Sequence, residues 1–237
     1  MRYRTLLIDF DGTLFDTRNA IRKTLEALAG RRGAAPFAAH LIDQVIDQGL
    51  SLVDMLGALL GPGDVLGLPA WVADYRAIYN GGLGVAQSAP YPGVEAVVQQ
   101  LHEAGKELFI VSNKGEVSIL ATLEQYRLGP CFRGVVAAVG DRAPKPDPAS
   151  FFERVRPRMR HDDNARVLMI GDTEIDLGYA RNLGVASCWA AYGYGLASRC
   201  EVLAPDFVIH SATDLLRLDD YRATKMRPGA SDNLVNR

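Results

Sequence analysis

Cysteine and histidine are scarce in this chain, and their spacing excludes several kinds of site. The 237 residues contain three cysteines and four histidines. The cysteines form no Cys-x-x-Cys pair and the histidines are scattered, so neither a disulfide framework nor a zinc site is predicted. Such cysteine usage suits a reducing compartment, and we expect the protein in the cytoplasm.

Long apolar runs and an excess of charge are also missing. No apolar stretch approaches the ~18 residues of a membrane span, and the first one breaks at Asp9, too early for a signal peptide. The formal net charge is only -2, whereas nucleic-acid and anionic-membrane surfaces require clustered positive charge. We therefore expect neither a nucleic-acid nor a membrane partner. We expect the protein to be a monomer or a homodimer.

The chain does have enough apolar residues, 48%, for a sizeable core. From about residue 85 onward, short β-rich segments alternate with segments of helical length. This alternation predicts an α/β fold, a Rossmann-like parallel sheet with helices on both faces. The expected strands are 3–8, 107–111, 134–138, 166–170, 185–189 and 207–209, and the expected helices are 94–104, 116–127, 149–156 and 174–183.

Residues 16–84 instead predict a small α-helical cap, inserted after the first strand. In the expected cap, Gly30 ends the first helix, Pro36 opens the second, Ser51 and Asp54 form a capping box for the third, and Pro69 opens the fourth. The run Gly81-Gly82-Leu83-Gly84 suggests a flexible return and, with residues 90–93, a hinge. We thus expect a core of residues 1–15 and 85–220, a cap of 16–84 and a disordered tail of 221–237.

Polar residues follow the expected strands at the points where the strands end. Ligands of open parallel sheets bind at that edge. The residues are Asp9 and Asp11 after the first strand, Ser112 and Asn113 after the second, Lys145 after the third, and Asp172 and Asp176 after the fourth. Each has an ordinary structural reading: Asp-x-Asp occurs in surface turns, Ser112 and Asn113 could cap a helix, and Lys145 could be a solvated loop lysine. Together they predict a site for a metal ion or a reacting group.

This set resembles the haloacid dehalogenase superfamily of phosphohydrolases, whose four motifs appear as DFDGTL, the serine of VSNK, the lysine of KPDP, and GDTEID. The resemblance covers about residues 5–210 in the right order. The helical insertion after the first motif is similar to the cap of the phosphoglycolate phosphatase-like branch. The resemblance implies a Mg²⁺-dependent phosphatase that acts on a small phosphorylated metabolite, with phosphoglycolate as the first substrate to test.

The resemblance also implies roles for these residues. Asp9 is the expected nucleophile, which forms an aspartyl-phosphate, and Asp11 is the expected general acid and base. Mg²⁺ is expected on the carboxylates of Asp9 and Asp172 and on the main-chain carbonyl of Asp11, with Asp176 acting indirectly. Ser112, Asn113 and Lys145 are expected to bind the phosphoryl oxygens of the substrate.

Specificity is expected to reside in the cap. The loop 49–51 is a candidate for contact with the leaving group. Arg22, Lys23 and Arg76 read as solvated helix charges, although one of them could reach a substrate anion and the sequence does not say which. The run Tyr192-Gly193-Tyr194-Gly195 lacks the third glycine of a dinucleotide loop, which favours a structural loop.

Other functions remain open from the sequence. A phosphomutase of the β-phosphoglucomutase type would share Asp9 and Asp11 and differ mainly in the cap. An inorganic pyrophosphatase is another alternative, which a panel of substrates would distinguish. A non-catalytic phosphate-binding regulatory module is the alternative from another class, although it predicts the loss of the acid or of the metal aspartate, and both are present. A dehalogenase is disfavoured because its substrate needs no Mg²⁺ and that branch lacks an acid at the Asp11 position. A glycosyltransferase with an Asp-x-Asp metal site would not need Lys145 or Asp172.

Overall fold

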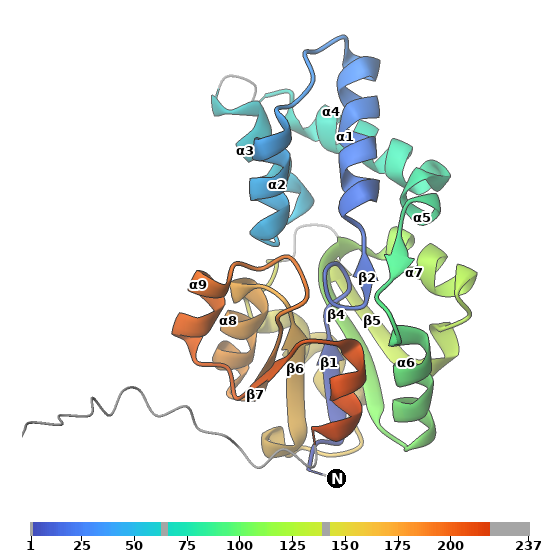
Figure 1. Cartoon of the computed structure of the whole chain (residues 1–237), viewed down its shortest axis with the longest axis vertical. Coiled ribbons are helices and arrows are strands. Elements are labelled where there is room, and N and C mark those ends of the chain that lie inside the picture. Colours follow the sequence, from blue (N-terminus) through green and yellow to red (C-terminus); the bar gives the residue numbers. More distant parts are fainter. Residues whose placement is uncertain (1, 63–65, 139–142, 219–237) are drawn as a thin grey trace, which may run out of the picture.

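The central sheet consists of six parallel strands in the order β5-β4-β1-β6-β7-β8 (Figure 1). The strands are β1 (Thr5–Ile8), β4 (Glu107–Gly115), β5 (Phe132–Ala138), β6 (Val167–Gly171), β7 (Ala186–Ala190) and β8 (Phe207–Ile209). The computed structural model describes residues 2–62, 66–138 and 143–218. The parallel α/β fold predicted from the alternating pattern is confirmed, and the expected tail lies outside the described residues.

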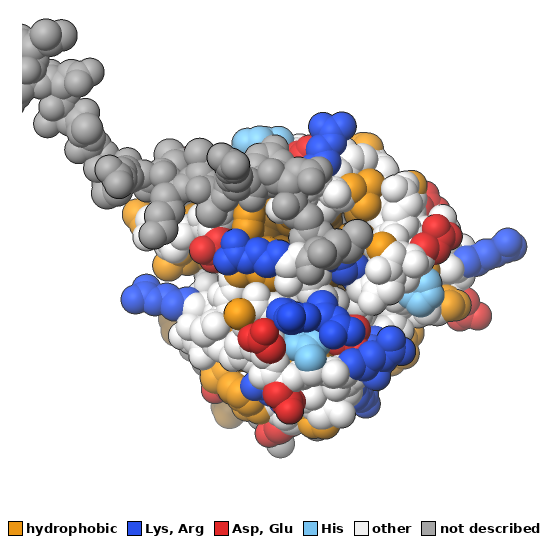
Figure 2. Space-filling model, turned by 90° about the horizontal axis from the view of Figure 1, so that it is seen from below, with side chains coloured by type: hydrophobic (Ala, Val, Ile, Leu, Met, Phe, Trp, Pro, Cys, Tyr) orange, Lys and Arg blue, Asp and Glu red, His pale blue; other side chains and the backbone are white. Residues whose placement is uncertain are grey.

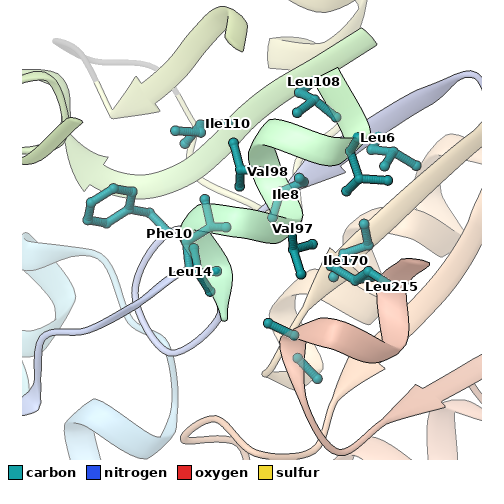
Figure 3. Close-up of a cluster of buried hydrophobic side chains, with 14 of the residues drawn as sticks. Leu6, Ile8, Phe10, Leu14, Val97, Val98, Leu108, Ile110, Ile170 and Leu215 are labelled. Atoms are coloured by element: carbon teal, nitrogen blue, oxygen red, sulfur yellow. The ribbon is translucent and has the colours of Figure 1, made fainter. Parts of the chain in front are cut away.

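The sheet buries apolar side chains on both faces, which explains the unbroken apolar runs of its strands. Leu6 and Ile8 of β1 point into one cluster, and Leu7 points into another on the opposite face. Figure 3 shows the first cluster, in which Leu6 and Ile8 lie near Val97 and Val98. That face is covered by α6 (Val94–Glu103), α7 (Glu116–Gln125) and the 3₁₀ helix η8 (Ala212–Arg217), and the other face by α8 (Glu174–Leu183) and the turns at 151–158.

The strand register brings the carboxyl ends of the central strands to one level. Ile8 of β1 lies opposite Ile110 of β4 and Ile170 of β6. The residues that follow Ile8 and Ile170 therefore leave the sheet side by side. In Figure 1 this is the upper edge of the sheet, and the lower edge, seen from below in Figure 2, carries intermixed basic and acidic side chains.

Four helices stand above the upper edge of the sheet in Figure 1. They are α1 (Arg18–Arg32), α2 (Ala39–Asp47), α3 (Leu52–Leu60) and α4 (Leu68–Ile78). They share a separate apolar cluster that includes Leu25, Leu28, Leu56 and Trp71. Half of the predicted capping box at the third helix is present: the amide of Asp54 donates to Ser51 Oγ at 3.2 Å, but the Asp54 carboxylate accepts from the Ser51 hydroxyl and not from its backbone N–H. Within the described residues, no helix is long and apolar enough to cross a membrane.

The two chain segments that join these helices to the sheet lie side by side. The short strands β2 (Phe15–Asp16) and β3 (Ala89–Pro90) pair antiparallel, with Phe15 opposite Pro90. The sequence did not predict this ladder, since two residues are too few to show alternation.

The expected glycine return at residues 81–84 falls within η2 (Tyr79–Leu83) and α5 (Gly84–Ala86), and the chain kinks there at Gly82, whose φ is 111°. Gly84 packs against the Tyr79 ring so closely that a Cβ would collide with it. This glycine permits close packing.

Two further helix predictions were wrong in detail. The first helix runs through Gly30 and ends at Arg32, where Gly33 adopts a left-handed conformation with φ 63°. Helices often end in a residue with this left-handed conformation, which glycine adopts without a steric penalty. The expected helix 149–156 is helical but is mostly not an α-helix: a π turn (Phe151–Val155) is followed by a 3₁₀ turn (Arg156–Arg158). Pro157 has no N–H with which an α-helix could continue.

Candidate active site

The predicted site residues Asp9, Lys145, Asp172 and Asp176 converge at the upper edge of the sheet. Lys145 Nζ donates to Asp9 Oδ1 at 2.7 Å and to Asp176 Oδ1 at 2.5 Å. One carboxylate oxygen from each of Asp9, Asp172 and Asp176 lies within 4.8 Å of the other two. The convergence on which the sequence prediction depended is therefore present, and it joins residues more than a hundred positions apart.

Asp9 occupies an environment that disfavours its ionised form. Burial raises the pKa of Asp9 to about 6, the charges of Asp176 and Asp11 add to that rise, and Lys145 opposes it. Conversely, burial lowers the pKa of Lys145, but attraction to Asp176 and Asp9 outweighs burial and the net shift is upward. Lys145 is therefore a permanent cation between two carboxylates.

Asp172 is fully buried and held in one orientation by two donors. Thr13 Oγ1 donates to Asp172 Oδ1 at 2.8 Å, and the amide of Tyr194 donates to Oδ2 at 2.7 Å. Burial raises the pKa of Asp172 well above its usual range, and the charges of Asp176 and Asp9 raise it further. The two hydrogen bonds oppose this rise, because they favour the carboxylate.

Two glycines make room for the Asp172 carboxylate. A Cβ on Gly12, which has φ 78°, would collide with it, and so would a Cβ on Gly193. The Tyr-Gly-Tyr-Gly run is thus a structural loop, as its sequence indicated, and its backbone approaches Asp172 closely.

The three clustered carboxylates fit a divalent cation of the Mg²⁺ type. Carboxylate oxygens are the ligands that this ion prefers. Lys145 supplies one positive charge against the three carboxylates of the cluster, so a second cation would relieve the remaining repulsion. Asp176 belongs to this cluster, whereas the sequence analysis gave it only an indirect part. It also completes a capping box with Thr173 at the start of α8.

The Asp11 side chain engages a different set of partners. Thr17 Oγ1 donates to Asp11 Oδ1 at 2.7 Å, and Lys114 Nζ lies 3.0 Å from the same oxygen. Lys114 Nζ also donates to the Tyr79 hydroxyl at 2.8 Å. Asp11 is therefore only two residues from Asp9, but its carboxylate pairs with Lys114 and Thr17 and not with Lys145.

Lys114 is a site residue that the sequence analysis passed over. Its side chain is only 8% exposed. Burial lowers the pKa of Lys114, but attraction to Asp11 and to Tyr79 outweighs burial and the net shift is upward. The available signal was its place directly after Ser112 and Asn113, yet nothing in the sequence indicated which carboxylate it would meet.

Asn113 holds the loop that carries Lys145. The Lys145 amide donates to Asn113 Oδ1 at 2.8 Å, and Asn113 Nδ2 donates to the Lys145 carbonyl at 3.2 Å. Ser112 is buried beside it and accepts from the amide of Lys114 at 3.3 Å. Neither residue caps α7, whose N-cap is Gly115. Their predicted contact with phosphate remains a prediction.

A cavity of about 610 Å³ opens above these residues, between the sheet edge and the helices. Asp9, Asp11 and Lys145 line its base, and the loop 49–51 and α4 contribute to its wall. Its volume lies in the range of small-molecule sites. The arrangement offers a buried carboxylate beside a fixed cation, a second carboxylate with its own lysine, and room for a ligand.

The comparisons with known proteins agree on one family. A sequence model of the haloacid dehalogenase-like hydrolase family matches residues 6–190. A phosphoglycolate phosphatase from Caulobacter vibrioides is 31% identical over 213 residues, which cover 89% of this chain and 88% of that protein. Phosphoglycolate phosphatase 1 from Pseudomonas aeruginosa is 27% identical over 235 residues, 96% of this chain and 84% of the relative.

Solved structures share the fold at lower identity. A haloacid dehalogenase-like family hydrolase from Streptococcus pneumoniae superposes with a TM-score of 0.76 at 19% identity, covering 90% of this chain and 97% of the other. A protein from Haemophilus somnus, described as a predicted phosphoglycolate phosphatase, gives 0.81 at 18% identity, covering 92% and 99%. At these sequence identities the structural similarity supports the fold alone.

Proposed function

The chain belongs to the haloacid dehalogenase-like hydrolases and is a phosphatase of that family, and on that premise we propose that it hydrolyses phosphoglycolate with Mg²⁺ through an aspartyl-phosphate. The observation that carries this proposal is the convergence of Asp9, Lys145 and Asp172 at one sheet edge. The choice of substrate rests on relatives that bear the name phosphoglycolate phosphatase.

In the proposed reaction, an oxygen of the Asp9 carboxylate attacks phosphorus and the bond to the ester oxygen breaks. Asp11 gives its proton to the departing alkoxide and then takes a proton from the water that attacks the aspartyl-phosphate. Lys145 holds Asp9 in place and offsets charge on the transferred group. Bound Mg²⁺, held by Asp9 and Asp172 with the Asp11 carbonyl, would offset the repulsion between the phosphate and Asp9.

We further propose that residues 16–84 act as a cap over this edge and exclude bulk water during the reaction. The position of the four helices above the cavity supports this role. The protein is proposed to work in the cytoplasm as a monomer or homodimer on a small metabolite, a setting that suits its three free thiols.

The proposal is tested by turnover of four compounds with MgCl₂: 2-phosphoglycolate, p-nitrophenyl phosphate, inorganic pyrophosphate and β-glucose 1-phosphate. We expect phosphoglycolate to give the highest kcat/KM, on the order of 10⁴ M⁻¹ s⁻¹ or more. Preference for pyrophosphate would indicate a pyrophosphatase, and conversion of glucose 1-phosphate to the 6-phosphate a mutase. Binding of phosphate without turnover of any compound would indicate a regulatory module. Each of these results would overturn the proposal.

Substituting Lys114 tests the proposed role of Asp11 as the general acid. In Lys114→Met the ammonium that holds Asp11 is lost and the aliphatic stem is kept. We expect kcat for phosphoglycolate to fall about 10- to 100-fold, a part of what a general acid contributes. The fall for p-nitrophenyl phosphate should be smaller, because nitrophenolate leaves without a proton.

A circular dichroism melt of the variant controls for folding. Equal falls on both substrates would show that Lys114 does not act through Asp11. Tyr79→Phe removes only one partner of Lys114 and should give a weaker effect of the same kind.

A further inference from the structure

Two of the three cap cations that could have met a substrate anion already have acidic partners. Arg22 forms an ion pair with Asp43 across α1 and α2. Lys23 Nζ lies 2.9 Å from Glu26 on its own helix, and its side chain is half exposed. Arg76, in contrast, has no hydrogen bond or ion pair with any residue that the structure describes.

Arg76 also lies on the wall of the cavity, which Arg22 and Lys23 do not line. It belongs to α4, three residues before Tyr79, so the two share one side of the helix and are separated by about 4.5 Å along its axis. Tyr79 reaches Lys114, and Lys114 reaches Asp11. Arg76 is therefore about one helical turn from the chain of contacts that ends at the proposed acid, on the side where the leaving group would lie.

The other cations of the cavity wall are neutralised within the described structure. Lys145 lies between Asp9 and Asp176, and Lys114 is paired with Asp11. The cap carboxylate on the same wall, Asp54, accepts from Ser51 Oγ at 2.6 Å. An incoming anion thus finds an uncompensated guanidinium at Arg76. A guanidinium matches a carboxylate with two parallel hydrogen bonds.

From this arrangement we infer that Arg76 binds a second anionic group of the substrate, a carboxylate close to the phosphate ester, and so sets the specificity of the cap. The inference rests on the proposed function and deepens it, since it names the cap residue that recognises the carboxylate of the substrate. In phosphoglycolate a single methylene separates the ester oxygen from the carboxylate, and Asp9 and Arg76 line the same cavity. With the phosphate at Asp9, the inference directs the carboxylate toward α4. Arg76 is exposed, which leaves it free to meet such a ligand.

The test compares 2-phosphoglycolate with 2-hydroxyethyl phosphate, which replaces the carboxylate by a neutral hydroxymethyl group. The quantity measured is the ratio of their kcat/KM values. In Arg76→Gln we expect this ratio to fall about 10- to 100-fold, the range for losing hydrogen bonds between charged groups. Arg76→Lys should give an intermediate ratio, because lysine keeps the positive charge but cannot form the two parallel hydrogen bonds of a guanidinium. Lys23→Gln, which removes a cap cation away from the cavity, should leave the ratio as in the wild type.

An unchanged ratio in Arg76→Gln would overturn the inference while the proposed function stands. If the wild type does not turn over phosphoglycolate, the proposed function fails, and inhibition of p-nitrophenyl phosphate hydrolysis by the two compounds then tests Arg76 alone. Preferential inhibition by phosphoglycolate that is lost in Arg76→Gln would support the inference. Equal inhibition by both compounds would overturn it.

Discussion

Replacing Asp9 by asparagine is expected to lower kcat by at least about 10⁴-fold, the scale on which hydrolases lose activity when their nucleophile is removed. Asparagine keeps the size of the side chain and can still accept a hydrogen bond from Lys145, which now donates to Asp9 at 2.7 Å. It cannot supply the carboxylate that attacks phosphorus. The loss should appear with both phosphoglycolate and p-nitrophenyl phosphate, because every substrate needs the same first step.

The same substitution should not destabilise the fold. Burial raises the pKa of Asp9 to about 6, so the folded state holds a proton on Asp9 more readily than the unfolded state does. This group therefore lowers stability as the pH rises from about 4 to 6 and stays unfavourable above that range. Without metal at pH 7.5, Asp9→Asn should melt at or above the temperature of the wild type.

Asp206→Asn is the matched control, because Asp206 is exposed and its carboxylate accepts from the Ser187 amide, away from the cavity. We expect it to keep wild-type turnover. Substantial activity in Asp9→Asn, measured on protein free of wild-type contamination, would remove Asp9 from the role of nucleophile and with it the proposed mechanism.

The sheet and the buried cluster were predictable because they follow from local patterns and one general rule. Apolar runs separated by helices imply parallel strands, and parallel strands end at the same edge. Asp9 and Asp172 directly follow the strand residues Ile8 and Gly171, so their proximity needed no knowledge of side-chain packing.

The contacts of Lys114 were only partly predictable in the same way. Lys114 lies at the end of β4, beside β1, so the rule places it near Asp11 across 103 positions. Its contact with Tyr79 depends instead on how the helices above the sheet are oriented. Local patterns do not set such orientations. Gly84 shows the same limit, since the sequence cannot tell a glycine that bends from one that admits a neighbouring ring.

Removing the divalent cation should have the second-largest effect, because Asp9, Asp172 and Asp176 form a buried carboxylate cluster with Lys145 as its cation. We expect EDTA to lower kcat/KM by at least about 100-fold, since metal ions contribute several kcal/mol of transition-state stabilisation, and added Mg²⁺ to restore it. Mg²⁺ at about 100 times its Kd stabilises the fold by about 2.7 kcal/mol, so the melting temperature should rise by about 5 to 10 °C. Asp172→Asn should abolish this rise, and Asp206→Asn should keep it. An unchanged rise in Asp172→Asn would place the ion elsewhere, and full activity in EDTA would exclude it from the reaction.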